Sequence, residues 1–105
     1  MIFRETTIFT QTLLEILPDD QYSDLQKALA SNPELGEIIS GGGGIRKVRW
    51  SLPGKGKRSG VRIIYYWAVS RDLILMLLIY PKSKQTDLTP AEIAILKRLV
   101  KEEFK

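Results

Sequence analysis

Residues 61–80 read VRIIYYWAVSRDLILMLLIY, a stretch rich in β-branched, aromatic and aliphatic side chains. Such side chains favour strands and the polar residues 70–72 suit a tight turn, so we expect strands at 61–69 and 73–80. The nearly continuous apolar run at 73–80 is typical of a central strand. Strands joined by so short a turn are antiparallel neighbours, and this hairpin is therefore the centre of the predicted sheet.

The sequence before this hairpin predicts two further strands and two helices. They are a strand at 2–6, a helix at 9–17, a second helix that ends near 31–33, and a strand at 45–50. We expect Pro18 to end the first helix and Asp19 or Asp20 to cap the second. Four glycines at 41–44 break the chain before the strand at 45–50, as a surface connection would.

The remaining segments predict a basic loop and a last helix. Residues 51–60 read SLPGKGKRSG, which indicates a positively charged loop between two strands. Thr89, Pro90 and Glu92 form a capping-box signature at the start of a helix. The resulting order β-α-α-β-β-β-α predicts an α+β fold, in which a small, largely antiparallel sheet is backed by an N-terminal helical hairpin and a C-terminal helix.

Composition limits both the architecture and the chemistry. With 105 residues, of which 44% are hydrophobic and 27% charged, we expect a single domain spanning 1–105. The sequence contains neither cysteine nor histidine, which excludes thiolate, cysteine–zinc and histidine-based chemistry. We expect no metal and no other cofactor, because no carboxylate cluster has ligand spacing. The longest uncharged apolar run, 73–80, is too short to span a membrane, so we expect a cytoplasmic protein.

Positive charge is concentrated in the middle of the chain. The net charge is +4, yet residues 38–71 contain no Asp or Glu and eight of the sixteen basic residues. These eight are Arg46, Lys47, Arg49, Lys55, Lys57, Arg58, Arg62 and Arg71. Such a density can neutralise phosphates through counterion release, and it favours binding of a polyanion over the alternative of a merely solvated basic face.

Four consecutive motifs carry a resemblance to a known family. They are GIRKVRW (44–50), GKGKRSG (54–60), VRIIYYW (61–67) and LLIYPKSKQTDLT (77–89). Their order and spacing resemble the RelE/HigB superfamily of type II toxin–antitoxin toxins, and most closely its HigB-like branch. The resemblance implies a RelE-like fold and a ribosome-dependent mRNA endonuclease that inhibits translation. Cleavage would need no metal, because the ribose 2′-oxygen attacks the adjacent phosphate.

The resemblance also implies partners. A cognate antitoxin, which we expect to be a helix-turn-helix protein, would hold the toxin inactive. Ribosome and mRNA would be its targets, and operator DNA would be contacted only through the toxin–antitoxin complex. We expect no interaction with membranes.

The same resemblance suggests catalytic residues. Arg62 matches the strand arginine that contacts the scissile phosphate, and Lys47 with Arg49 matches a pair of lysines, one of which accepts the proton of the 2′-hydroxyl. Arginine stays protonated, so Lys47, or the loop residues Lys55 and Lys57, are better candidates for the general base. Residues two apart on a strand share a face, so Lys47 and Arg49 should project together.

The segment after the last strand departs from the family pattern. Ser83 stands where the family usually has arginine, and Thr89 stands where it commonly has tyrosine. Lys82 or Lys84 could instead protonate the departing 5′-oxygen. Further RNA contacts are expected from Arg46, Lys55, Lys57, Arg58 and Tyr80, where Tyr80 either stacks on a base or fills the core.

Two other functions remain compatible with the sequence. One is a ParE-like toxin that inhibits a topoisomerase by binding alone, and the other is a non-enzymatic nucleic-acid-binding module. The basic loop and the lysines near Lys82 favour the endonuclease, because a protein that binds only another protein would not need them.

Overall fold

The computed structural model describes residues 1–51, 60–85 and 87–105. The elements are β1 (Ile2–Glu5), α1 (Thr7–Ile16), α2 (Asp19–Ser31), β2 (Glu37–Ile38), β3 (Ile45–Trp50), β4 (Val61–Ala68), a short 3-10 helix (Val69–Arg71), β5 (Leu73–Pro81) and α3 (Pro90–Glu103). The α+β class and the predicted order of elements are confirmed, with β2 and the 3-10 helix as additions. Most of the predicted basic loop, residues 52–59, lies outside the described residues.

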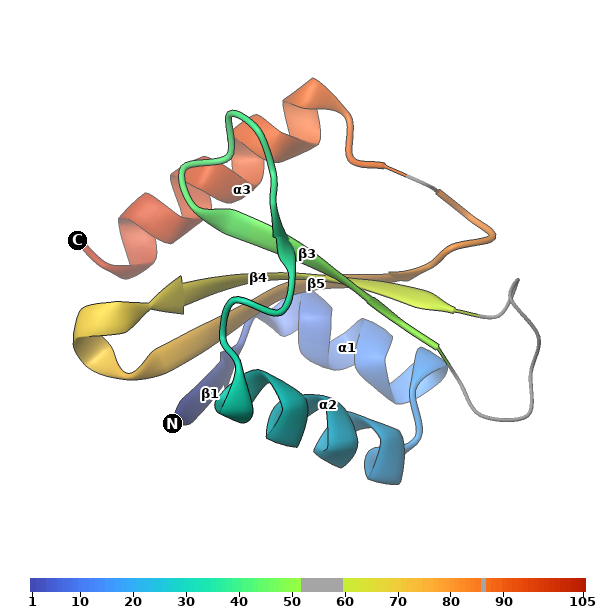
Figure 1. The fold of residues 1–105 in the computed structure, drawn as a ribbon. Helices are drawn as coiled ribbons and strands as arrows, with labels where there is room; N and C mark the ends of the chain where they lie inside the picture. The colour runs from blue at the N-terminus through green and yellow to red at the C-terminus, as the bar shows by residue number, and fades with distance from the viewer. Residues whose placement is uncertain (52–59, 86) are drawn as a thin grey trace.

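One mixed sheet organises the molecule, in the strand order β1-β5-β4-β3-β2. The pairs β2–β3, β3–β4 and β4–β5 are antiparallel. The remaining pair, β1 with β5, is parallel. Helices α1 and α2 cover one face and α3 covers the other (Figure 1). The hairpin of β4 and β5 is central, as the apolar pattern of 61–80 predicts.

A separate hydrophobic core lies on each face of the sheet. Phe9 of α1 and Leu25 of α2 are fully buried against the face that includes Val48. Leu96 of α3 packs against the opposite face, which includes Ile64. Fully burying each such side chain contributes about 1.5–3 kcal/mol, so both faces help to fix the sheet on which the charged residues lie.

The helix ends both correct and confirm the sequence interpretation. The expectation that Asp19 or Asp20 caps α2 is wrong, because the N-cap position is Pro18 and no side-chain cap bond forms there. Both aspartates lie in the first turn, where a carboxylate still interacts favourably with the helix dipole. Thr6 caps α1 by accepting a hydrogen bond from the Phe9 amide, and the capping box at the start of α3 is confirmed.

The glycine-rich connection between β2 and β3 approaches α3. Gly41, Gly43 and Gly44 have positive φ angles of 76°, 69° and 105°, which favour glycine. A Cβ atom on Gly43 would lie 3.3 Å from the side chain of Lys97 in α3. Figure 1 shows this connection rising from the sheet beside α3. The glycine-rich connection therefore lies against the middle of α3.

Candidate functional site

Three side chains on neighbouring strands form a row across the sheet. Arg49 of β3 lies opposite Arg62 of β4, and Arg62 lies opposite Tyr80 of β5. Directly opposed residues project from the same face of a sheet. This is the face covered by α3, because Tyr80 packs in the same core as Leu96. Lys47, which lies opposite Ile64, projects from the same face next to the row.

Arg62 is the buried charge at the centre of this row. Its exposed fraction is 9%, and the only hydrogen bond of its guanidinium to another described residue is a long one of 3.4 Å to the Val61 carbonyl. Charged side chains are rarely buried without a partner. Because Arg49 is also a cation, the position opposite Arg62 adds repulsion rather than pairing. A phosphate could relieve this repulsion by accepting hydrogen bonds from both guanidinium groups.

A carboxylate that the sequence interpretation missed lies at this cluster. Lys47 Nζ donates a hydrogen bond of 2.6 Å to Asp87 Oδ1, and the two groups form an ion pair. That hydrogen bond and the charge of Lys47 lower the pKa of Asp87 below its ordinary value, and the charges of Arg49 and Arg62 lower it further. Asp87 is thus an exposed carboxylate of the same chain that lies within the electrostatic reach of all three cations. Forty residues separate it from Lys47, so no local sequence pattern connects them.

Tyr80 places an unpaired hydroxyl beside Arg62. The residue is 7% exposed, and its hydroxyl has no hydrogen-bond partner among the described residues. Burial raises the pKa of Tyr80, the charge of Asp87 raises it further, and the charge of Arg62 opposes the shift. The group is therefore a neutral phenol that can donate a hydrogen bond. The ring packs in the core and the hydroxyl is itself buried, so a ligand would have to displace neighbouring atoms to reach it.

The family assignment follows from a match over most of the chain. Residues 9–105 match the family described as the RelE toxin of the RelE / RelB toxin–antitoxin system. The chain belongs to the RelE toxin family. It is therefore a toxin of a toxin–antitoxin system, whose family members pair with RelB-type antitoxins and are generally mRNA-cleaving endoribonucleases.

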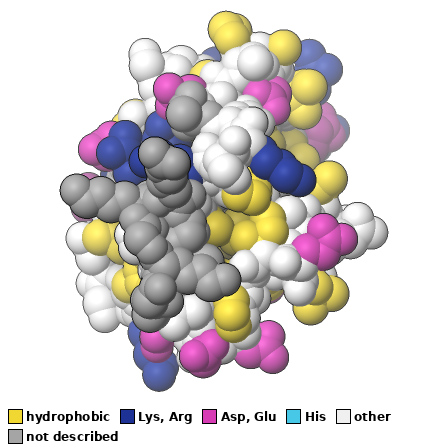
Figure 2. Space-filling view, turned by 90° about the vertical axis from the view of Figure 1, so that its right-hand side faces the viewer, with side chains coloured by type: hydrophobic (Ala, Val, Ile, Leu, Met, Phe, Trp, Pro, Cys, Tyr) yellow, Lys and Arg dark blue, Asp and Glu magenta, His cyan; other side chains and the backbone are white. Residues whose placement is uncertain are grey.

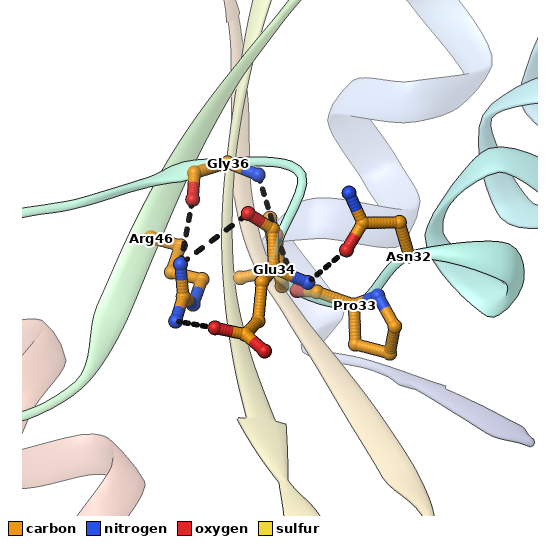
Figure 3. Close-up of polar contacts among 6 residues, drawn as sticks. Asn32, Pro33, Glu34, Gly36 and Arg46 are labelled. Atoms are coloured by element: carbon orange, nitrogen blue, oxygen red, sulfur yellow. Dashed lines mark hydrogen bonds and ion pairs between the residues drawn. The ribbon is translucent and has the colours of Figure 1, made fainter.

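Arg46 of this RelE-family toxin lies apart from the other basic residues. It projects from the α1–α2 side of the sheet, where its guanidinium donates to the Gly36 carbonyl at 2.8 Å and pairs with the Glu34 carboxylate at 3.6 Å (Figure 3). The hydroxyl of Tyr65 joins the same network by donating to Pro33 and accepting from the Gly36 amide. These contacts fasten residues 33–36 to the sheet, and they do not bring Arg46 to the expected RNA-binding cluster.

The predicted leaving-group lysines lie in the turn after β5. The Lys82 amide donates to the Gly60 carbonyl at 3.0 Å, and the Lys84 amide donates to the Pro81 carbonyl at 3.1 Å. Lys82 is half-buried and Lys84 is exposed. Figure 2 views this end of the molecule, where basic and hydrophobic side chains lie next to the residues drawn in grey. Lys55, Lys57 and Arg58 fall among those residues, and their expected roles lie outside the described part of the toxin.

Neither a metal site nor a membrane span is found in the part of the toxin that the structure describes. No group of three or more Asp and Glu residues in 1–51, 60–85 and 87–105 is arranged to hold a metal ion. In the same ranges, no helix has the length and apolar character needed to cross a bilayer.

Proposed function

We propose that this toxin is a ribosome-dependent mRNA endonuclease of the HigB-like branch. The observation that carries the proposal is the row of Arg49 and Arg62, in which a buried guanidinium faces a second cation and lacks a carboxylate partner among the described residues. An RNA phosphate supplies the charge that this row lacks. The domain 1–105 would act in the cytoplasm without a metal or other cofactor.

Cleavage would proceed by attack of the ribose 2′-oxygen on the adjacent phosphorus. The new O2′–P bond forms while the P–O5′ bond breaks, which leaves a 2′,3′-cyclic phosphate and a free 5′-hydroxyl. Arg62 and Arg49 would stabilise the charge that develops on the phosphate oxygens. Preorganised donors of this kind contribute about 10²- to 10³-fold each when they act in a water-poor site. The Tyr80 hydroxyl, which is buried beside Arg62, would donate a third hydrogen bond once binding of the substrate exposes it.

The reaction also requires two proton transfers. Lys47, or Lys55 or Lys57 in the basic loop, would accept the proton of the 2′-hydroxyl, and Lys82 or Lys84 would protonate the departing 5′-oxygen. Lys47 donates to Asp87 as an ammonium group, so it must leave that carboxylate and lose a proton to solvent before it can act as the base. The Asp87 side chain is 75% exposed and therefore screened by water, whereas the Lys47 side chain is 15% exposed, so the competing charge of an RNA phosphate can separate the pair.

Control of the toxin would follow from the same positive charge. We expect the cognate antitoxin, a helix-turn-helix protein, to cover this face with acidic or apolar residues. Antitoxin and ribosome would then exclude each other, and the toxin would contact operator DNA only within the toxin–antitoxin complex. Association with ribosomes should weaken steeply with salt, because each lysine or arginine releases counterions on contact with RNA.

Expression of the chain in growing cells tests the proposed function. We expect growth arrest and a halt in translation, with mRNA cut inside translated regions, and recovery when the antitoxin is co-expressed. Normal growth at confirmed expression would contradict the proposal. Growth arrest with intact mRNA and impaired DNA topology would instead identify a ParE-like inhibitor.

A further inference from the structure

A cleft of about 310 Å³ opens beside the ion pair of Lys47 and Asp87. Its walls come from residues 37–40 at the edge of the sheet, Lys47 of β3, residues 87–88 and Ile93 of α3. These segments are distant in sequence and meet because the glycine-rich connection approaches α3. The cleft is therefore a product of the tertiary fold, and it shares Lys47 with the proposed cleavage site.

The lining of the cleft combines apolar side chains with a few polar ones. Its apolar walls are formed by Ile39, Leu88 and Ile93, while Glu37 and Ser40 supply hydrogen-bonding groups. Ligand sites typically enclose about 300–1,000 Å³ and combine apolar walls with a few polar groups. A cleft at the lower end of this range can hold a single ring system, but not a folded peptide element.

The distribution of charge favours a phosphate at the arginine row and an uncharged base in the cleft. Arg49, on the same strand as Lys47, and Arg62, on the neighbouring strand, attract a phosphate. Glu37 and Asp87 line the cleft and repel one. Lys47 belongs to both regions, so a nucleotide whose phosphate contacts Lys47 brings its own base within reach of the cleft. This arrangement favours RNA over an antitoxin peptide, because a peptide gives no reason for a phosphate site to adjoin the cleft.

We propose that this cleft binds one nucleobase of the RNA substrate and sets base preference at that position. The inference rests on the proposed function, since it assigns a subsite to the same reaction. A carboxylate only accepts hydrogen bonds, so Glu37 favours bases that present amino groups. Guanine, which offers adjacent ring N–H and amino donors, fits best, and uracil fits worst.

The test compares the bases at which ribosome-bound mRNA is cut by wild-type toxin and by two variants. Glu37→Ala should reduce the preference for amino-bearing bases over uracil by about 10-fold, within the range for loss of a paired contact to a base edge. Ser40→Phe should fill the cleft and lower kcat/KM for every sequence. The matched controls are Glu15→Ala and Ser70→Phe, which change exposed residues outside the cleft. An unchanged base preference in Glu37→Ala would overturn the proposal.

A second measurement separates failure of the cleft from failure of the proposed function. Guanosine 3′-monophosphate, uridine 3′-monophosphate and inorganic phosphate are titrated against the purified toxin and followed by amide NMR. The guanosine nucleotide should shift the amides of residues 37–40, Leu88 and Ile93, and phosphate alone should not. If wild-type toxin cuts no mRNA but these shifts occur, only the endonuclease assignment fails. If Ser40→Phe abolishes antitoxin binding while cleavage and base preference stay unchanged, the cleft serves the antitoxin and the proposal is wrong.

Discussion

Replacing Arg62 should raise stability and abolish most of the activity in one substitution. Arg62 is 9% exposed and lies opposite another cation, so the folded state bears a desolvation cost that a methionine of similar length would not. Exchanging a buried charge for a well-packed apolar side chain is often neutral or stabilising, by about 1–4 kcal/mol. We expect Arg62→Met to raise the free energy of unfolding by about 1 kcal/mol, the low end of that range.

The rate of mRNA cleavage should fall in the same variant. Loss of one preorganised donor to the phosphate predicts a rate lower by about 10²-fold, and Arg62→Ala should show the same loss. Ribosome binding should change much less, since other basic residues share that task. Arg98→Met changes an exposed arginine on α3 and should leave both quantities close to wild type.

The assays are urea denaturation for stability and single-turnover cleavage on programmed ribosomes for activity. Circular dichroism confirms that each variant is folded. If Arg62→Met destabilised the protein and cut mRNA at the wild-type rate, Arg62 would be a structural residue and the assignment of the row would be refuted.

Four further predictions concern neighbouring residues. Lys47→Ala should slow single-turnover cleavage by about 10²- to 10⁴-fold if Lys47 is the base, and Lys47→Arg should not restore it; a near-normal rate in Lys47→Arg would show a purely electrostatic role. Tyr80→Phe should lower kcat by about 10-fold with little change in KM or stability, because its hydroxyl has no partner to lose among the described residues. The folded-state pKa of Asp87 is lowered, so its contribution to stability is present above its ordinary pKa of 3.8 and is lost as the pH falls through the lower folded-state value. Asp87→Asn should remove this part of the acid transition in denaturation curves. An identical acid transition in the variant would refute the pairing with Lys47. Arg46→Ala should cost about 1–3 kcal/mol in denaturation because the Gly36 carbonyl loses its charged donor, yet leave the rate per folded molecule unchanged; a selective loss of cleavage would return Arg46 to the RNA-binding set.

Local patterns in the sequence predict much of the fold. The hairpin of residues 61–80 follows from β-branched and aromatic composition around a short polar turn, and the start of α3 follows from the spacing of Thr89 and Glu92. The predicted N-cap of α2, Asp19 or Asp20, is wrong because aspartate is favourable both at the N-cap and in the first turn. Composition cannot separate these two positions. The parallel pairing of β1 with β5 depends on a contact between distant segments that no local pattern encodes.

The candidate site could be predicted only in part for the same reason. Alternation along β3 places Lys47 and Arg49 on one face, and the structure has them there. Neither the opposition of Arg49 and Arg62 nor the approach of Asp87 could be read from the sequence, because both depend on strand register and on the path of the chain after β5. The network that holds Arg46 likewise depends on residues 33–36 folding back on β3.

The most direct test of the central claim is the chemistry of the RNA ends produced in one turnover. Purified toxin is mixed with programmed ribosomes, and the cut ends of the mRNA are analysed. We predict a 2′,3′-cyclic phosphate on one fragment and a 5′-hydroxyl on the other, formed at a rate about 10²-fold lower in Arg62→Ala. A 5′-phosphate end, or equal rates in wild type and Arg62→Ala, would contradict attack by the 2′-oxygen at the arginine row.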